Sequence, residues 1–186
     1  MGKVYERIDE RMAAWIERQP VFFVATAPLA SDGLVNVSPK ATRGTFRVLD
    51  EHTFGYVDLT GSGIETVAHL RENGRICVMF CAFDGRPDIV RLHGIGSAVT
   101  LGEPGFEAAC APFADAVAPR EPAVRAVVTV EVHRIADSCG FGVPLMDLRA
   151  ERDVLDSWSE KKGPDRLHRY RAEHNVASLD DLPGLD

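Results

Sequence analysis

Apolar and polar residues change their spacing several times in the first third of the chain. In residues 5–18 apolar side chains recur three or four positions apart among charged ones, which predicts an amphipathic helix that Pro20 ends. The continuous apolar run 21–27 predicts a buried strand, and residues 34–38 predict a second strand returning from a turn at 31–33. The pattern therefore favours a helix followed by a β-hairpin.

The central part of the chain predicts more strands and one inserted helix. Short strands are expected at 46–49 and 53–57, and a helix at 64–70 follows a glycine turn and stops near Asn73-Gly74. Further strands are expected at 75–82 and 89–101, where Gly94 and Gly96 indicate a bulge or a close backbone approach.

The last part of the chain predicts one more strand and several helices. We expect a short helix at 103–116 interrupted by Pro112, a long strand at 126–136, and charged helices at 150–162 and 165–175. Six or seven strands with a helix after the fourth predict a mainly β fold, an antiparallel β-barrel with α additions. We expect the barrel to span residues 1–148, with residues 149–186 as a C-terminal helical extension packed on it.

Composition narrows the class of protein. A chain of 186 residues suits one domain, and its net charge of −7 argues against general nucleic-acid binding while leaving room for a local phosphate pocket. No apolar run reaches the roughly 18 residues of a membrane span, and the charged N-terminus lacks a secretion signal, so we expect a cytoplasmic protein that contacts no membrane. Cysteine and histidine spacings form no metal pattern, so reduced thiols and no metal site are expected.

Three segments in order carry a family resemblance. Val35-Asn36-Val37-Ser38-Pro39-Lys40, then residues 54–66, then Asn73-Gly74-Arg75-Ile76-Cys77-Val78 resemble the pyridoxamine 5′-phosphate oxidase-like, FMN-binding split barrel, over about residues 15–137. Two later segments, residues 138–146 and 170–184, resemble an uncharacterised subgroup of that family. The resemblance implies a Greek-key antiparallel barrel with flanking helices that binds FMN at a homodimer interface.

The resemblance also implies which residues contact the cofactor. They are Val37, Ser38, Lys40, Tyr56, Val57, Asp58, Ser62, Gly63, Thr66 and Arg91. Free N–H groups at the helix start after Gly61-Ser62-Gly63 would bind the phosphate, although Thr60 or Ser62 could instead cap the helix with Glu65 completing a capping box.

One departure from the family changes the expected phosphate site. Ile64-Glu65-Thr66 replaces the usual Arg-Lys pair, so Lys40, with Arg43 or Arg91, would have to neutralise the phosphate. Each of these residues also has an interpretation that involves no cofactor. Lys40 could be a solvated loop lysine, Tyr56 could pack in the core, and Arg91 could form a cross-strand ion pair.

Other polar residues support weaker hypotheses. His69 is four residues after Glu65, so the two could pair on one helix face. Residues 139–142 could form an active-site lid, with Cys139 as a candidate reactive thiol.

The resemblance implies an FMN-dependent oxidoreductase. Its partners would be a small-molecule substrate and NAD(P)H as a candidate reductant, and no catalytic side chain is assigned. The alternatives are a flavin- or haem-binding protein without turnover, and a deazaflavin-dependent reductase on the same fold.

Overall fold

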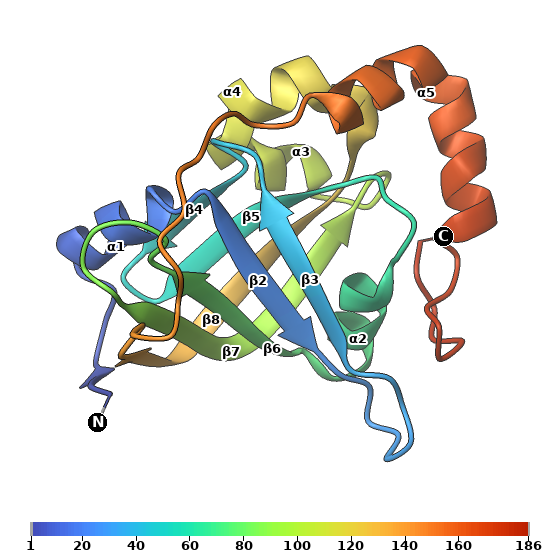
Figure 1. The fold of residues 1–186 in the computed structure, drawn as a ribbon. Helices are drawn as coiled ribbons and strands as arrows, with labels where there is room; N and C mark the ends of the chain where they lie inside the picture. Colours follow the sequence, from blue (N-terminus) through green and yellow to red (C-terminus); the bar gives the residue numbers. More distant parts are fainter. Residues whose placement is uncertain (1, 186) are drawn as a thin grey trace.

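One curled antiparallel sheet forms the body of the protein in the computed structural model, which describes residues 2–185. The strands follow the order β3-β2-β6-β7-β8-β5-β4, and β1 pairs with β8 (Figure 1). They are β1 (Val4–Tyr5), β2 (Val21–Thr26), β3 (Asn36–Ala41), β4 (Phe46–Asp50), β5 (Thr53–Leu59), β6 (Arg75–Cys81), β7 (Ile89–Thr100) and β8 (Val124–Ser138). The expected mainly β barrel with α additions is confirmed.

The inside of the curled sheet is packed with aromatic and branched side chains. Residues alternate between buried and half-buried along β2, as the pleat requires for a sheet with one face in the core. Phe22 lies at the centre, with ring centroids 4.8 Å from Phe46, 5.4 Å from Tyr56 and 5.5 Å from Phe80. These tilted, edge-to-face and stacked contacts hold the opposite walls of the barrel together.

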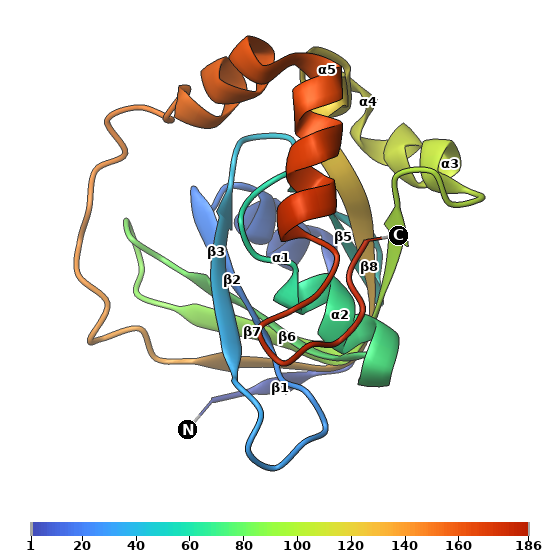
Figure 2. The same cartoon turned by 90° about the vertical axis from the view of Figure 1, so that its right-hand side faces the viewer.

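Helices cover the ends and one side of the barrel (Figure 2). Helix α2 packs against β2 and β7, and α5 packs against the 3-10 segment that precedes β8. The helices are α1 (Glu10–Glu17), α2 (Glu65–Asn73), α3 (Phe106–Cys110), α4 (Ala114–Val117) and α5 (Val154–His174), with 3-10 turns at Ala111–Phe113 and Ala118–Ala123. None of the described helices is long and apolar enough to cross a membrane.

One helix prediction, at the N-terminus, needs correction. The expected helix 5–18 begins only at Glu10, because the Asp9 carboxylate accepts the Met12 N–H at 2.7 Å and caps it there. Val4 and Tyr5 instead pair with Ala136 and Ile135 of β8. The two expected C-terminal helices are both present: α5 consists of two helical segments separated by a kink at Gly163, where φ is 68° and ψ is 170°.

Gly94 confirms the predicted bulge. The pairing of β7 with β8 shifts register between His93 and Gly94. A Cβ atom on Gly94 would lie 1.9 Å from the Glu131 carbonyl oxygen, so only glycine lets the two backbones approach this closely.

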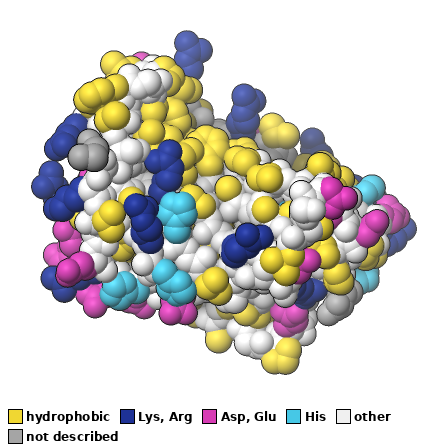
Figure 3. Space-filling view, turned by 90° about the horizontal axis from the view of Figure 1, so that it is seen from below, with side chains coloured by type: hydrophobic (Ala, Val, Ile, Leu, Met, Phe, Trp, Pro, Cys, Tyr) yellow, Lys and Arg dark blue, Asp and Glu magenta, His cyan; other side chains and the backbone are white. Residues whose placement is uncertain are grey.

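Two segments after β8 determine the surroundings of the site. Residues 139–153 form an extended connection that arcs around the barrel before α5 begins (Figure 2). Residues 175–185, the C-terminal tail, fold back beside α2, where Arg71 donates to the Gly184 carbonyl. Seen from below, the molecule shows apolar side chains interspersed with charges of both signs (Figure 3).

Candidate functional site

A groove of about 610 Å³ lies between β3, the end of β5 and the C-terminal extension. Most of its lining is apolar, as in typical small-molecule sites, with Lys40 and Asp58 as a polar pair. The barrel contributes Pro20, residues 39–42 and residues 57–61. The extended connection and the C-terminal extension contribute Leu148, Ala150, Glu151, Arg152, Val154, Leu155 and Trp158. Thus the barrel and the extension together form the groove.

A buried ion network joins β3 to β5 beside this groove. Lys40 on β3 forms an ion pair with Asp58 on β5, although these strands are not neighbours in the sheet. Arg125 on β8 donates from Nε to the second Asp58 oxygen at 2.8 Å. Burial by itself would raise the pKa of Asp58, but the charges of Lys40 and Arg125 and their hydrogen bonds lower it to about 2. The carboxylate is therefore ionised at neutral pH.

The C-terminal extension contributes two buried side chains to the same network. The Asn175 amide oxygen accepts from Arg125 Nη1 at 3.0 Å, and its Nδ2 donates to the Gly61 carbonyl at 2.9 Å. Arg171 donates to the Thr60 hydroxyl at 3.0 Å and to the Pro122 carbonyl at 3.1 Å. The sequence did not predict the roles of Arg125 and Arg171. Each is a single arginine in a strand or a helix, and the residues next to it give no sign that its side chain is buried.

The start of α2 lacks the predicted side-chain cap. Ile64 occupies the N-cap position, and no side chain caps the helix, so the capping-box alternative is wrong. Thr60 instead donates its hydroxyl to the Ala123 carbonyl at 2.8 Å, and Ser62 is exposed. The Glu65 carboxylate folds back over Gly63, where an added Cβ would lie 2.3 Å from Glu65 Oε2.

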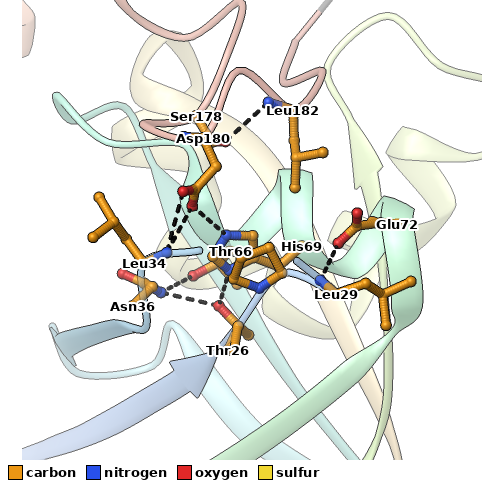
Figure 4. Close-up of polar contacts among 12 residues, drawn as sticks. Thr26, Leu29, Leu34, Asn36, Thr66, His69, Glu72, Ser178, Asp180 and Leu182 are labelled. Atoms are coloured by element: carbon orange, nitrogen blue, oxygen red, sulfur yellow. Dashed lines mark hydrogen bonds and ion pairs between the residues drawn. The ribbon is translucent and has the colours of Figure 1, made fainter. Parts of the chain in front are cut away.

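A second polar cluster ties α2 to β2, β3 and the C-terminal tail (Figure 4). Asn36 Nδ2 lies 3.1 Å from both the Thr26 and the Thr66 hydroxyl oxygens and donates to each. His69 Nδ1 lies 2.9 Å from Thr26 Oγ1, and its Nε2 lies 3.8 Å from Asp180 Oδ2. His69 therefore faces Thr26 and the tail, and the expected pairing with Glu65 is wrong.

This cluster has the composition of a Thr-His-Asp triad but not its accessibility. Thr26 and His69 are both buried, with His69 at 0% exposure, so no substrate can reach the threonine oxygen. Asp180 also accepts the Leu34 N–H at 3.1 Å. The cluster therefore anchors the tail to the β2–β3 hairpin.

The remaining predicted residues are distributed between the groove, the core and the surface. Val57 lines the groove, while Ser38 donates to the Asn36 amide oxygen at 2.9 Å and Val37 is exposed on the other face of β3. Tyr56 is completely buried in the aromatic core, as in the packing alternative, and burial raises the pKa of its hydroxyl well above 10. The structure thus brings only Lys40, Val57 and Asp58 of the ten into the groove lining.

Arg91 lies on β7, away from the groove. Its Nη1 donates to the Ser138 hydroxyl at 2.9 Å, so the expected cross-strand partner is a serine and not an acid. Arg43 is exposed and faces Glu151 at 3.7 Å. Neither arginine lines the groove.

The thiols show no sign of activation by their surroundings. Burial raises the pKa of Cys77, Cys81 and Cys110, which keeps these thiols protonated at neutral pH. Cys139 is exposed and unpaired. Across residues 2–185 no group of three His, Cys, Asp or Glu side chains is arranged to hold a metal ion.

A larger cavity, of about 710 Å³, lies between α1, the β6–β7 loop and the extended connection. It contacts none of the ten predicted cofactor residues, and much of its lining consists of charged side chains such as Arg18, Asp84 and Arg86. The smaller groove is therefore the better candidate site. The strand segments that resemble the family's flavin-contacting segments meet the buried ion network there.

Comparisons with known proteins agree on the family. The family model described as pyridoxamine 5′-phosphate oxidase matches residues 8–139. The pyridoxamine 5′-phosphate oxidase family protein ustO of Aspergillus flavus is 38% identical over 198 residues, covering 97% of this chain and 77% of that protein.

Solved structures show the same fold. The HupZ protein from Group A Streptococcus aligns with a TM-score of 0.53 and 27% identity, covering 69% of this chain and 91% of that one. A Clostridium acetobutylicum protein related to general stress protein 26 of B. subtilis, of the pyridoxinephosphate oxidase family, aligns with a TM-score of 0.51 and 15% identity, covering 80% and 99%. The chain therefore has the split-barrel fold and belongs to the pyridoxamine 5′-phosphate oxidase family.

Proposed function

We propose that this protein binds the ring system of a flavin in the 610 Å³ groove and acts as an oxidoreductase on a small molecule. The observation that carries the proposal is the position of the groove, whose barrel side consists of the strand segments that resemble the flavin-contacting segments of the family. A bound flavin would supply the hydride or electron transfer, with NAD(P)H as a possible reductant, and the protein would hold and orient the ring.

The groove suits a flat aromatic ring better than it suits a phosphate. Apolar side chains, including Pro39, Val57 and Leu155, line it, and Trp158 adds an aromatic side chain. The expected phosphate site at the start of α2 does not fit, because Glu65 folds over Gly63 and Asp58 neutralises Lys40. FMN bound through that helix start is therefore not part of the proposed function.

No observation favours the other cofactors. The described groove lining contains no His, Cys, Met or Tyr, the side chains that most often ligate haem iron. A deazaflavin with a charged tail would need a basic extension of the groove, whereas Lys40 and Arg152 are balanced there by Asp58 and Glu151.

Flavin binding is tested by filling the groove. The purified protein should quench riboflavin fluorescence on titration, and Ala41→Trp should weaken this binding at least tenfold because the indole would take the place of the ring. Ala172→Trp, on the exposed side of α5, should leave binding unchanged. Equal binding by the wild type and Ala41→Trp would show that the ligand does not occupy this groove.

We also propose a homodimer, as the family resemblance implies. The extended connection leaves large apolar side chains in solvent: Phe141 is 82% and Leu145 80% exposed, and Met146 and Leu148 are more than half exposed. A monomer gains nothing from such exposure, whereas a second copy could cover these side chains.

The connection provides the test of the dimer. We expect sedimentation velocity to give the mass of two chains for the wild type and of one chain for Phe141→Glu/Leu145→Glu. Leu179→Glu, an exposed apolar position on the C-terminal tail, should remain dimeric. A monomeric wild type at micromolar concentration would contradict the proposal.

A further inference from the structure

We infer that the site selects a flavin without a terminal phosphate, such as riboflavin, because the chain's own groups occupy the phosphate position. This inference rests on the proposed flavin binding and names the ligand class of the same groove. It concerns the loop from Thr60 to Ile64 and the first turn of α2.

The first argument is the position of the Glu65 carboxylate. The start of a helix attracts an anion, because its first N–H groups are unpaired and carry partial positive charge. In this chain the Glu65 carboxylate already lies beside the glycine turn that precedes the helix: its Oε2 would lie 2.3 Å, and its Cδ 3.3 Å, from a Cβ on Gly63. A ligand phosphate would have to displace this carboxylate or lie beside it, and two negative charges at contact distance repel.

The second argument is that side chains of the protein already hydrogen-bond to the backbone of the loop. The Gly61 carbonyl accepts from Arg125 Nη1 at 3.1 Å and from Asn175 Nδ2 at 2.9 Å. On the other side, a Cβ on Gly184 would lie 2.8 Å from the Ile64 side chain, so the C-terminal tail is packed directly against the helix start. Several such contacts hold the loop in its present shape.

The third argument concerns the cations. Lys40 and Arg125 both bind Asp58, and Arg171 donates to Thr60 and to the Pro122 carbonyl. The groove lining itself carries two cations, Lys40 and Arg152, and two anions, Asp58 and Glu151. A phosphate would therefore enter a groove without excess positive charge, whereas an uncharged ribityl chain would not disturb this balance.

The fourth argument is the state of Thr66, the remaining predicted phosphate ligand. Thr66 is buried, and its hydroxyl oxygen accepts from Asn36 Nδ2 at 3.1 Å (Figure 4). The same Asn36 amide also binds Thr26 in the cluster that anchors the tail. Because Thr66 is buried and does not line the groove, a phosphate bound in the groove would not reach its hydroxyl.

The experiment compares riboflavin with FMN by fluorescence quenching at constant ionic strength. We expect the wild type to bind riboflavin at least as tightly as FMN. Glu65→Gln should shift the ratio of the two dissociation constants about tenfold toward FMN, because it removes the carboxylate at the helix start. Glu72→Gln, at the far end of α2, keeps an oxygen acceptor for the Leu29 N–H and should leave the ratio unchanged.

The outcomes separate this inference from the proposed function. FMN binding ten times more tightly than riboflavin in the wild type would overturn the selectivity, while flavin binding itself would stand. Absence of binding by either flavin would overturn the proposed function, and inorganic phosphate then tests the helix start by itself. For the wild type, about 20 mM phosphate should raise the melting temperature no more than chloride of equal ionic strength does. If phosphate does raise it specifically, a larger rise in Glu65→Gln would support the role of Glu65. An equal rise in the wild type and in Glu65→Gln would contradict that role.

Discussion

Replacing Asp58 with asparagine is expected to lower the free energy of unfolding by about 3–5 kcal/mol, the usual cost of breaking a buried ion pair. Asp58 is 2% exposed and is the carboxylate that both Lys40 and Arg125 bind. Without its charge, the Arg125 guanidinium remains buried with only neutral partners, Gly61 and Asn175. Urea unfolding followed by circular dichroism measures the loss.

Glu51→Gln provides the control for this substitution. Glu51 forms an ion pair with Arg7 at 3.3 Å, but both side chains are more than half exposed. Such pairs contribute at most about 1 kcal/mol, so this variant should unfold close to the wild type. Similar losses for the two variants would mean that the Asp58 network does not stabilise the fold.

The contribution of Asp58 should also appear in the pH dependence of the free energy of unfolding. The pKa of Asp58 is about 2 in the folded protein, below its ordinary value of 3.8, so its charge stabilises the fold above about pH 4. This contribution, about 2 kcal/mol, is lost as the pH falls from about 4 to about 2. Asp58→Asn should lack this part of the acid transition.

Replacing Gly94 with valine is expected to cost about 3 kcal/mol or more, because the new side chain meets backbone and not a movable side chain. Its Cβ would lie 1.9 Å from the Glu131 carbonyl oxygen and 3.1 Å from Val132 Cα. The central pair of strands, β7 and β8, would have to separate at the bulge. Thermal unfolding should show the loss as a large decrease in melting temperature.

Gly142→Ala is the matched control for Gly94→Val. Gly142 lies in the exposed connection, and a Cβ there meets nothing within 4 Å. Its melting temperature should stay close to that of the wild type. If Gly94→Val melted equally close to the wild type, the close approach of β7 and β8 would be refuted.

Most of the fold could be predicted from the sequence because its signals are local. Strand β2, with half-buried and buried residues alternating, and the helix stop at Gly74, with φ of 70°, lie at or near their predicted positions. The bulge at Gly94 was predicted for the same reason, since glycine inside a strand marks a place where a side chain does not fit. β1 was missed because two residues are too few to show a period, and only its pairing with β8 makes it a strand.

The candidate site was predicted only in part, because its decisive contacts join residues far apart in the chain. Lys40 and Asp58 were both identified as flavin-contacting residues, but their mutual ion pair depends on the curling of the sheet that brings β3 opposite β5. Arg171 and Asn175 lie in a charged helix and at its end, and only the packing of α5 buries them against Thr60 and Gly61.

The sequence by itself determined the strand order along the chain, the glycine positions and the family resemblance, since periodicity and backbone freedom are properties of neighbouring residues. It also showed that an acid, Glu65, follows the glycine-serine turn. Only the tertiary structure decided where that acid points and which charges are already neutralised. The physical reason is that electrostatic balance depends on distance and burial, and both arise when separate segments pack together.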